Sequence, residues 1–250
     1  MIHLKNEKQL EIMRIAGRIT GEAIQAGREA IKPGVTTAEV DHVIHAYIVK
    51  CGAKPTFLGY GGFPASACIS VNDEVIHGIP SHNRVLKEGD IVSIDTGAFY
   101  RGYTGDSAAT FPVGKISPEA ERIIRVTEES FYRALEVLEK GSARVGDIGH
   151  AVESYCVENG CSVVRRYVGH GVGAELHEDP EIPNFGTPGH GIRIIPGMTI
   201  CVEPMVALGT GDVYEMPNGW TVRTKDGKLS SHYEHSIAIT SNGPELLTKV

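Results

Sequence analysis

Apolar positions recur at helical spacing in several stretches of the chain, and one of the best defined begins at Thr36. Three positions later comes Glu39, an arrangement that forms a capping box at a helix start, and Gly52 stands where the helical pattern stops. The pattern therefore predicts a helix over 36–50 that is closed by Gly52.

A second helix start lies at Ser117, which is followed by Pro118, and apolar residues continue at helical spacing towards Gly141. Between the helical stretches lie short apolar runs of the kind that form strands. These runs are IVSID (91–95), SAATFPV (107–113), MTICVE (198–203) and SIAIT (236–240). Helices and strands come in the same order twice, which predicts an α+β fold made of two similar halves.

The same order is accompanied by a weak internal repeat. A shift of 108 positions aligns residues 40–52 with 148–160 and residues 88–95 with 196–203. Chance similarity of two amphipathic helices is the alternative, but one offset that holds through a helix, a strand and the pair Asp95 and Glu203 favours duplication. We therefore expect one domain over 1–250, with halves of roughly 1–112 and 113–250 whose equivalent strands lie face to face around a cleft.

Composition and charge narrow the function classes. The 250 residues are 41% hydrophobic and 22% charged, which is typical of a globular protein with a sizeable core. A net charge of −7 without any Lys/Arg-rich block argues against nucleic-acid readout and against binding to anionic membranes. Charges at Lys5, Glu7 and Lys8 argue against a signal peptide, and glycines interrupt the charge-free stretch 55–72, so we expect neither secretion nor a membrane span.

The cysteines indicate a reducing environment. There are five of them, an odd number without a C-x-x-C motif, which argues against a disulfide framework and against a zinc finger. The cytoplasm is therefore the expected compartment. The oligomeric state is not readable from the sequence, and a monomer is the default expectation.

Four carboxylates occupy comparable places in the two halves. Asp95 ends an apolar run, and Asp106 begins the next one after a turn at 100–102, so a hairpin would bring the two close to opposite one another. In the second half, Glu203 and Glu234 are each expected in a strand. The fold would then bring four acidic side chains together.

Taken singly, each carboxylate is more simply explained as a turn residue or a surface charge. Burying a charge without a partner is costly, and four converging carboxylates carry about −4, which two divalent cations would neutralise. The joint pattern therefore predicts a pair of metal ions. His170 lies between Gly169 and Gly171, which allow close approach of the backbone, and is the leading candidate for a nitrogen ligand; a structural turn histidine is the alternative.

Longer motifs surround these residues. They are ISVNDEVIHGIP (69–80), SIDTGAFYRGYTGDSAATF (93–111), GHGVGAELHEDPEIPNFG (169–186), VEPM (202–205), GWTVRTKDG (219–227) and YEHSIAIT (233–240). Together they resemble the type I methionine aminopeptidase family over essentially the whole chain. The resemblance implies a duplicated pita-bread fold with pseudo-two-fold symmetry around a central antiparallel sheet. It also implies five metal ligands: Asp95, Asp106, His170, Glu203 and Glu234.

By the same resemblance, we expect removal of the initiator methionine from nascent proteins, with a preference for a small second residue. Two divalent ions, Mn²⁺, Fe²⁺ or Co²⁺, suit a ligand set of carboxylates with one imidazole. A water or hydroxide between them would attack the first peptide carbonyl, with Glu203 as the proton shuttle, and the free amine would bind a metal. His77 would help the amine depart, and His177 would hydrogen-bond the carbonyl, although each is otherwise read as a core or surface histidine.

The resemblance further implies a pocket for the methionine side chain close to His77. The predicted pocket residues are apolar or soft groups that suit a thioether: Tyr60, Phe63, Cys68 and Trp220. Phe57 and Leu176 depart from the residues that relatives often carry, so the shape of the pocket is open there, and core packing is the alternative for both. Other histidines are read as core or surface residues: His42 and His45 are expected on a helix, and His190, His232 and His235 match no ligand position.

Two other functions stay open at this stage. A proline-specific peptidase of the same fold, such as aminopeptidase P or prolidase, would share the catalytic half, but those relatives carry a large N-terminal domain, and only about 35 residues precede the first repeat here. A non-catalytic pita-bread protein, serving as a binding or ribosome-associated module, would be expected to lack metal ligands. The expected partners are the N-termini of nascent polypeptides, with the ribosome as a candidate place of encounter.

Overall fold

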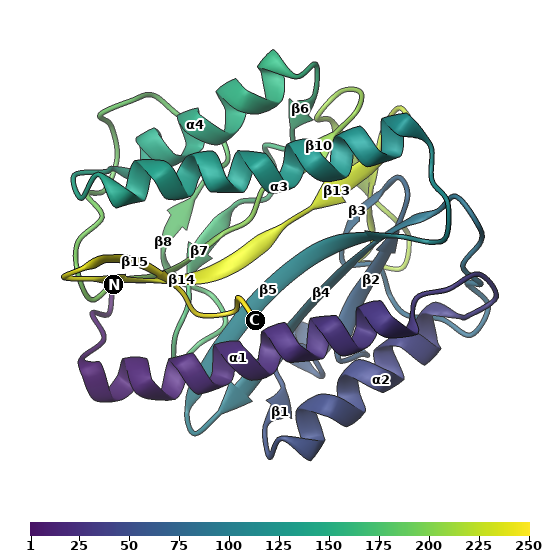
Figure 1. Ribbon diagram of the computed structural model, residues 1–250, viewed down its shortest axis with the longest axis horizontal. Helices are drawn as coiled ribbons and strands as arrows, with labels where there is room; N and C mark the ends of the chain where they lie inside the picture. Colours follow the sequence, from purple (N-terminus) through teal and green to yellow (C-terminus); the bar gives the residue numbers. More distant parts are fainter.

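Two pairs of long helices, one pair from each half of the chain, pack against a curved sheet (Figure 1). The computed structural model describes residues 1–250. The helices are α1 (Glu7–Ala30), α2 (Thr37–Lys50), α3 (Pro118–Glu139) and α4 (Val145–Glu158), and one 3₁₀ turn, η1, spans Tyr60–Gly62. No helix is both long enough and apolar enough to cross a bilayer.

The two predicted helix starts are confirmed. The Thr36 hydroxyl accepts the backbone N–H of Glu39 at 3.2 Å, and the Glu39 carboxylate accepts the backbone N–H of Thr36 at 2.7 Å, which completes the capping box of α2. Ser117 caps α3, and Pro118 is its first helical residue. Gly52 follows α2 with a φ of 74°, a left-handed conformation that glycine adopts without strain.

A nine-stranded antiparallel sheet runs through both halves. Its strands are β1 (Lys54–Pro55), β2 (Ala67–Val71), β4 (Ile91–Tyr100), β5 (Tyr103–Pro112), β7 (Gly169–Gly171), β8 (Glu178–Ile182), β9 (Thr199–Val202), β14 (Glu234–Thr240) and β15 (Gly243–Leu246). Their order is β1-β4-β5-β14-β9-β7-β8, with β2 also paired to β4 and β15 to β14. The halves meet where β5 pairs with β14. The expected face-to-face arrangement is therefore wrong: the halves join edge to edge, because their free strand edges hydrogen-bond to each other.

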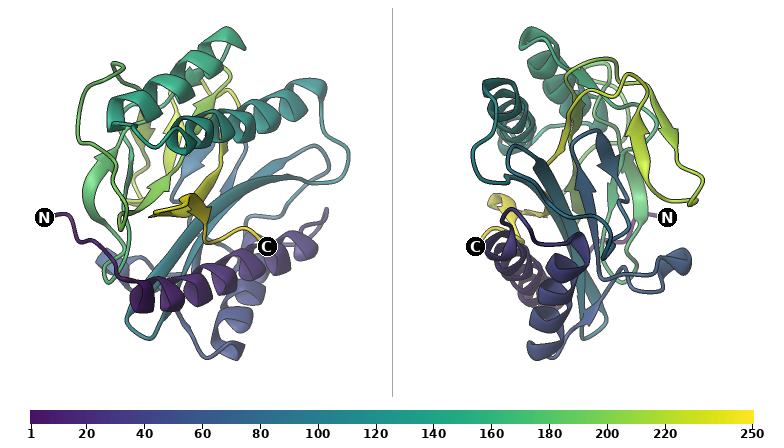
Figure 2. Two further views of the ribbon diagram at one scale, coloured as in Figure 1. Left: turned by 60° about the vertical axis from the view of Figure 1, so that its left-hand side comes forward. Right: turned by 90° about the vertical axis from the view of Figure 1, so that its right-hand side faces the viewer.

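Two small sheets complete the fold. One has the order β13-β10-β6, with β6 (Ser162–Val163), β10 (Met205–Ala207) and β13 (Ser230–His232); the other has the order β11-β12-β3, with β3 (Glu74–Ile76), β11 (Val213–Glu215) and β12 (Val222–Thr224). In the right-hand view of Figure 2, the long helices lie on one side of the large sheet and the β11–β12 hairpin projects on the other. The chain runs from β3 directly into His77 and from β13 towards Glu234, so both small sheets lead into the site described below.

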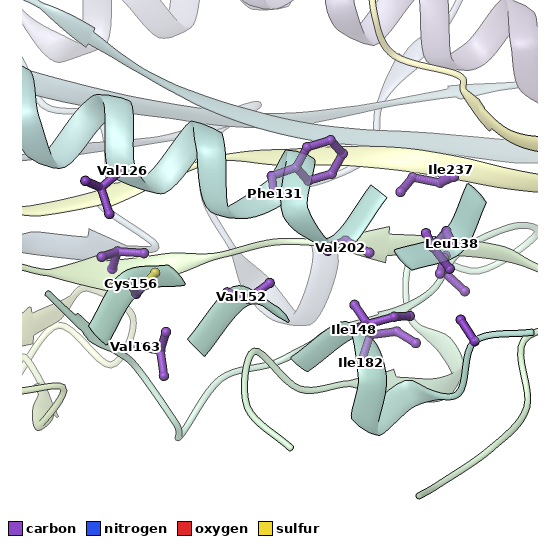
Figure 3. Packing of buried hydrophobic residues seen from close by; sticks show 14 of the residues in the cluster. Val126, Phe131, Leu138, Ile148, Val152, Cys156, Val163, Ile182, Val202 and Ile237 are labelled. Atoms are coloured by element: carbon purple, nitrogen blue, oxygen red, sulfur yellow. The ribbon is translucent and has the colours of Figure 1, made fainter. Parts of the chain in front are cut away.

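Each half has its own hydrophobic core beneath its own pair of helices. In the second half, Phe131 of α3 and Ile148 of α4 belong to one buried cluster with Ile237 of β14 (Figure 3). In the first half, Ile44 of α2 packs in a separate cluster with Ile94 of β4. Burial of such side chains is the main favourable contribution to folding. Two separate cores are what a duplicated fold predicts, and together they hold the central strands in place.

Helix α1 crosses β5 at a point where both backbones lack a side chain. A Cβ atom added at Gly105 would lie 2.7 Å from both the Cα and the N of Gly17. We expect Gly105→Ala to push α1 away from the sheet and to lower the free energy of unfolding by about 1–3 kcal/mol. Urea unfolding of both proteins measures the change, and a difference below about 0.5 kcal/mol would contradict the close approach.

Candidate metal centre and active site

Four carboxylates come together because their strands are neighbours in the large sheet. Asp95 lies on β4, Asp106 on β5 and Glu234 at the start of β14, and these strands are consecutive in the sheet. Glu203 directly follows β9, the next strand. The expectation that Glu203 lies inside a strand is wrong, because Pro204 has no N–H to continue the ladder. Each half thus contributes two carboxylates to one cavity.

The hairpin that carries the first two carboxylates differs in register from the expected one. Asp95 pairs with Ala108 and Asp106 pairs with Gly97, so the two carboxylates are diagonal neighbours rather than directly opposite. The cause is a two-residue turn at 101–102, where both residues have positive φ (46° and 93°), as in a type I′ turn. Both side chains still lie on the same face of the sheet.

The carboxylates are buried and incompletely hydrogen-bonded. Asp95 Oδ1, Asp106 Oδ1 and Glu234 Oε1 have no hydrogen-bond partner. Buried polar atoms are normally paired, and an uncompensated buried carboxylate is costly. Three unpartnered carboxylate oxygens in one cluster therefore fit a site for divalent cations.

His170 presents a free ring nitrogen to this cluster. Its Nδ1 lies 2.8 Å from the carbonyl oxygen of Gly171 and donates its proton there, which leaves Nε2 as the acceptor. Nε2 lies 3.4 Å from Glu203 Oε1 and 3.7 Å from Asp106 Oδ2. Burial lowers the pKa of His170 to about 3, so the ring is neutral and able to bind a cation.

Sequence reasoning missed a thiol beside these groups. The Cys201 Sγ and ligand atoms of Asp106, His170 and Glu234 all lie within 4.8 Å of one another. Cys201 precedes Glu203 by two positions in an extended segment, so both side chains point to the same side, and this spacing is the signal that could have found it. Burial raises the pKa of the thiol well above its usual value and keeps it protonated. Oxygen and imidazole donors thus dominate the cluster, as expected for a divalent metal site.

Burial raises the pKa values of all four carboxyl groups, and the charge of Asp106 raises those of the other three further. Burial is the main cause for each, and it raises the pKa of Asp106 to about 7. Burial first and the Asp106 charge next raise the pKa values of Asp95, Glu203 and Glu234 well above the usual range. The cluster therefore retains protons that an unfolded chain would release, and a cation has to displace them.

The metal-free protein is expected to lose stability as the pH rises. A carboxyl group with a raised folded pKa contributes stability fully below its unfolded pKa, about 4, and loses it as the pH rises through the folded value, about 7 for Asp106. We expect the free energy of unfolding to fall by a few kcal/mol from about pH 5 to about pH 8, as measured by urea unfolding with a chelator present. Adding Mn²⁺ should remove most of this fall, since metal affinity rises as protons leave. A flat profile in chelator would contradict the raised pKa values.

A cavity of about 310 Å³ opens beside the carboxylates. It is lined by all five residues predicted as metal ligands, Asp95, Asp106, His170, Glu203 and Glu234, and by all six predicted to bind substrate, Tyr60, Phe63, Cys68, His77, His177 and Trp220. Phe57 and Leu176 also line it, and both pack in a small apolar cluster with Phe63. Phe57 and Leu176 therefore both line the cavity and pack in an apolar cluster, so the two interpretations hold together.

The two further histidines, His77 and His177, line the same cavity as the carboxylates. His77 has a φ of 58°, a strained backbone conformation of the kind found at functional sites, and its ring meets Trp220 edge-on at 6.3 Å. The His177 ring lies 4.3 Å from the His170 ring, and its Nδ1 lies 2.6 Å from the Tyr60 hydroxyl. Burial lowers the pKa of His77 to about 4 and also lowers that of His177, so both rings are neutral.

None of the five histidines that were not assigned to the site lines the cavity: His42, His45, His190, His232 and His235. His45 and His235 are held elsewhere, His45 by the Ser66 hydroxyl at 2.8 Å and His235 by the Thr248 hydroxyl at 2.7 Å. His232 is different, because it is buried next to Glu203. Its Nε2 lies 3.7 Å from Glu203 Oε2. Nothing in its sequence position pointed to this contact.

The chain is similar to known metallopeptidases over nearly its whole length. The sequence model of the protein family "Metallopeptidase family M24" matches residues 11–241. The methionine aminopeptidase of Clostridium acetobutylicum is 53% identical over 248 residues, which is 99% of each chain. The crystal structure of methionine aminopeptidase from Thermotoga maritima has a TM-score of 0.98 at 44% identity, and each chain covers 100% of the other.

A more distant structure bears on the proline-specific alternative. Prolidase from Pyrococcus furiosus has a TM-score of 0.79 at 25% identity, and the match covers 99% of this chain but 65% of the prolidase. These likenesses show the pita-bread fold that the resemblance implied, and the proline-specific alternative is the less supported of the two. The chain therefore belongs to metallopeptidase family M24 and, within it, to the methionine aminopeptidases.

Proposed function

We propose that this protein is an aminopeptidase that removes the N-terminal methionine from polypeptides with the help of a pair of divalent metal ions. The observation that carries the proposal is the buried set of four carboxylates and one neutral imidazole at the end of a largely apolar cavity. The names of full-length relatives support the activity, and membership of a hydrolytic metallopeptidase family argues against a non-catalytic binding module.

The proposed ligands are Asp95, Asp106, His170, Glu203 and Glu234. Two divalent ions balance the charge of four carboxylates, and oxygen donors with one imidazole suit Mn²⁺, Fe²⁺ or Co²⁺. When bound, such ions supply a water of lowered pKa and polarise the peptide carbonyl. A monomer is the proposed oligomeric state.

The protein groups around the scissile bond have separate tasks in this proposal. The Tyr60 hydroxyl donates to His177 Nδ1, which places the ring proton on Nε2, where it can be donated to the carbonyl oxygen as charge develops. His77 contacts the scissile nitrogen. The Glu203 carboxylate takes the proton from the attacking water and passes it to the departing amine. The metal ions held by these ligands would bind the free amine of the substrate, and an internal peptide segment has no such amine to offer.

Specificity for methionine is assigned to the apolar part of the cavity. Phe63, Cys68 and Trp220, with Phe57 and Leu176, offer aromatic rings and a thiol that suit a flexible thioether. We propose a preference for a small second residue. The substrates are the N-termini of polypeptides, among them nascent chains at the ribosome, and the cytoplasm is the proposed compartment, in line with five free cysteines.

Cleavage of matched peptides tests the function. The Mn²⁺-loaded protein is expected to release methionine from Met-Ala-Ser, to leave Ala-Pro-Ala intact and to lose activity in excess chelator. Cleavage of Ala-Pro-Ala in preference to Met-Ala-Ser would favour the proline-specific alternative. Equal rates on Met-Ala and Met-Leu peptides would contradict the proposed second-residue preference.

A further inference from the structure

His232 lies beside the carboxylate cluster with no hydrogen-bond partner on either ring nitrogen. The residue is only 2% exposed, so water does not satisfy these atoms from outside. Leaving a buried polar group unpaired destabilises the folded state, and an apolar side chain of similar size would avoid that cost. A buried imidazole with two unpartnered nitrogens therefore needs an explanation in function.

The backbone of His232 is held firmly in relation to the site. The Thr110 hydroxyl accepts the backbone N–H of His232 at 3.0 Å and donates to its carbonyl oxygen at 2.9 Å. On the other side, His232 pairs with Met205, which lies two positions after Glu203. These contacts fix the backbone position from which the His232 side chain extends towards Glu203.

The ring faces one of the two oxygens of that carboxylate. His232 Nε2 lies 3.7 Å from Glu203 Oε2, whereas Glu203 Oε1 lies 3.4 Å from His170 Nε2. Glu203 therefore stands between two imidazoles, one for each oxygen. The contact with His232 is slightly longer than a hydrogen bond, and such contacts in sites without ligand often tighten when the site is filled.

We propose that His232 is a positioning residue that donates its Nε2 proton to Glu203 Oε2, so that Oε1 is directed at the metal centre. A hydrogen bond to a carboxylate is stronger than one between neutral groups, and it fixes the orientation of the acceptor. Groups that hydrogen-bond to metal ligands commonly contribute 10- to 100-fold in affinity. The inference rests on the proposed metal centre, in which Glu203 is a ligand.

Three substitutions separate hydrogen bonding from packing. His232→Leu fills similar space without a donor. His232→Gln carries an amide that reaches about as far as Nε2, whereas the amide of His232→Asn is one methylene shorter and does not reach Glu203. Calorimetric titration of the metal-stripped proteins with Mn²⁺ alone gives the affinity, and thermal unfolding without metal reports whether each variant is folded.

We expect His232→Leu and His232→Asn to weaken Mn²⁺ binding about 10- to 100-fold, and His232→Gln to stay within about threefold of the wild type. Wild-type affinity in both His232→Leu and His232→Asn would overturn the inference, and so would equal weakening in His232→Gln and His232→Asn. If His232→Leu fails to fold, the comparison of His232→Gln with His232→Asn still decides. A wild-type protein that binds no Mn²⁺ would instead refute the proposed metal centre itself.

Discussion

Replacing Asp106 by Asn is expected to lower kcat/KM for Met-Ala-Ser by at least about a thousandfold and to reduce the bound metal. Asp106 lies on β5 at the junction of the two halves, and the pKa values of the other three carboxyl groups all respond to its charge. An amide has nearly the same shape but lacks the charge that holds a cation. Loss of a ligand at a dinuclear centre removes both the nucleophile and the electrostatic stabilisation of the transition state.

The matched control for this substitution is Asp212→Asn, which changes an exposed aspartate outside the cavity. It carries the same chemical change and is expected to leave metal content and kcat/KM within about twofold of the wild type. Metal analysis of both purified variants accompanies the kinetics. An Asp106→Asn protein with full metal content and near-normal turnover would remove Asp106 from the ligand set.

His177→Ala is expected to lower kcat by about 100- to 1,000-fold with little change in KM. The His177 ring lies 4.3 Å from the His170 ring, and Tyr60 orients it, so it is placed to donate to an oxygen whose charge grows in the transition state. Removing one such donor typically costs this much, and an interaction made only in the transition state appears in kcat. Steady-state kinetics on Met-Ala-Ser measure both constants.

Exposed His190 supplies the control, because His190→Ala removes the same ring away from the cavity and is expected to leave kcat and KM unchanged. Metal content of His177→Ala should match the wild type, since His177 is not a proposed ligand. A loss confined to KM would mean that His177 binds ground state and transition state equally and does not stabilise charge.

Local sequence patterns predicted the parts of the fold that depend on neighbouring residues. The capping box at Thr36 and the Ser-Pro start at 117–118 act within one helical turn, so the helix starts could be located correctly. The repeat placed Asp95 and Glu203 in comparable positions, which led to a cluster of carboxylates. Such features are encoded over a few residues or by a constant offset.

Features that depend on pairing between distant segments could not be predicted from the sequence as well. The diagonal placement of Asp95 and Asp106 follows from a two-residue turn whose φ values the sequence does not reveal, and a small change in register alters which residues face each other. The pairing of β5 with β14 brings together two strand edges that lie far apart in the sequence. Cys201 and His232 reach the cluster only through strand pairing, so neither stood out beforehand.

Anomalous diffraction at the manganese absorption edge, from crystals of the protein grown with Mn²⁺, tests most directly whether acidic groups from both halves hold a metal pair. We predict two anomalous peaks, about 3.5–4 Å apart, among Asp95, Asp106, Glu203 and Glu234, with His170 bound to one of them. Crystals with ample manganese that show no peak in this cluster, or peaks only on the protein surface, would contradict the proposed metal centre and the peptidase mechanism built on it.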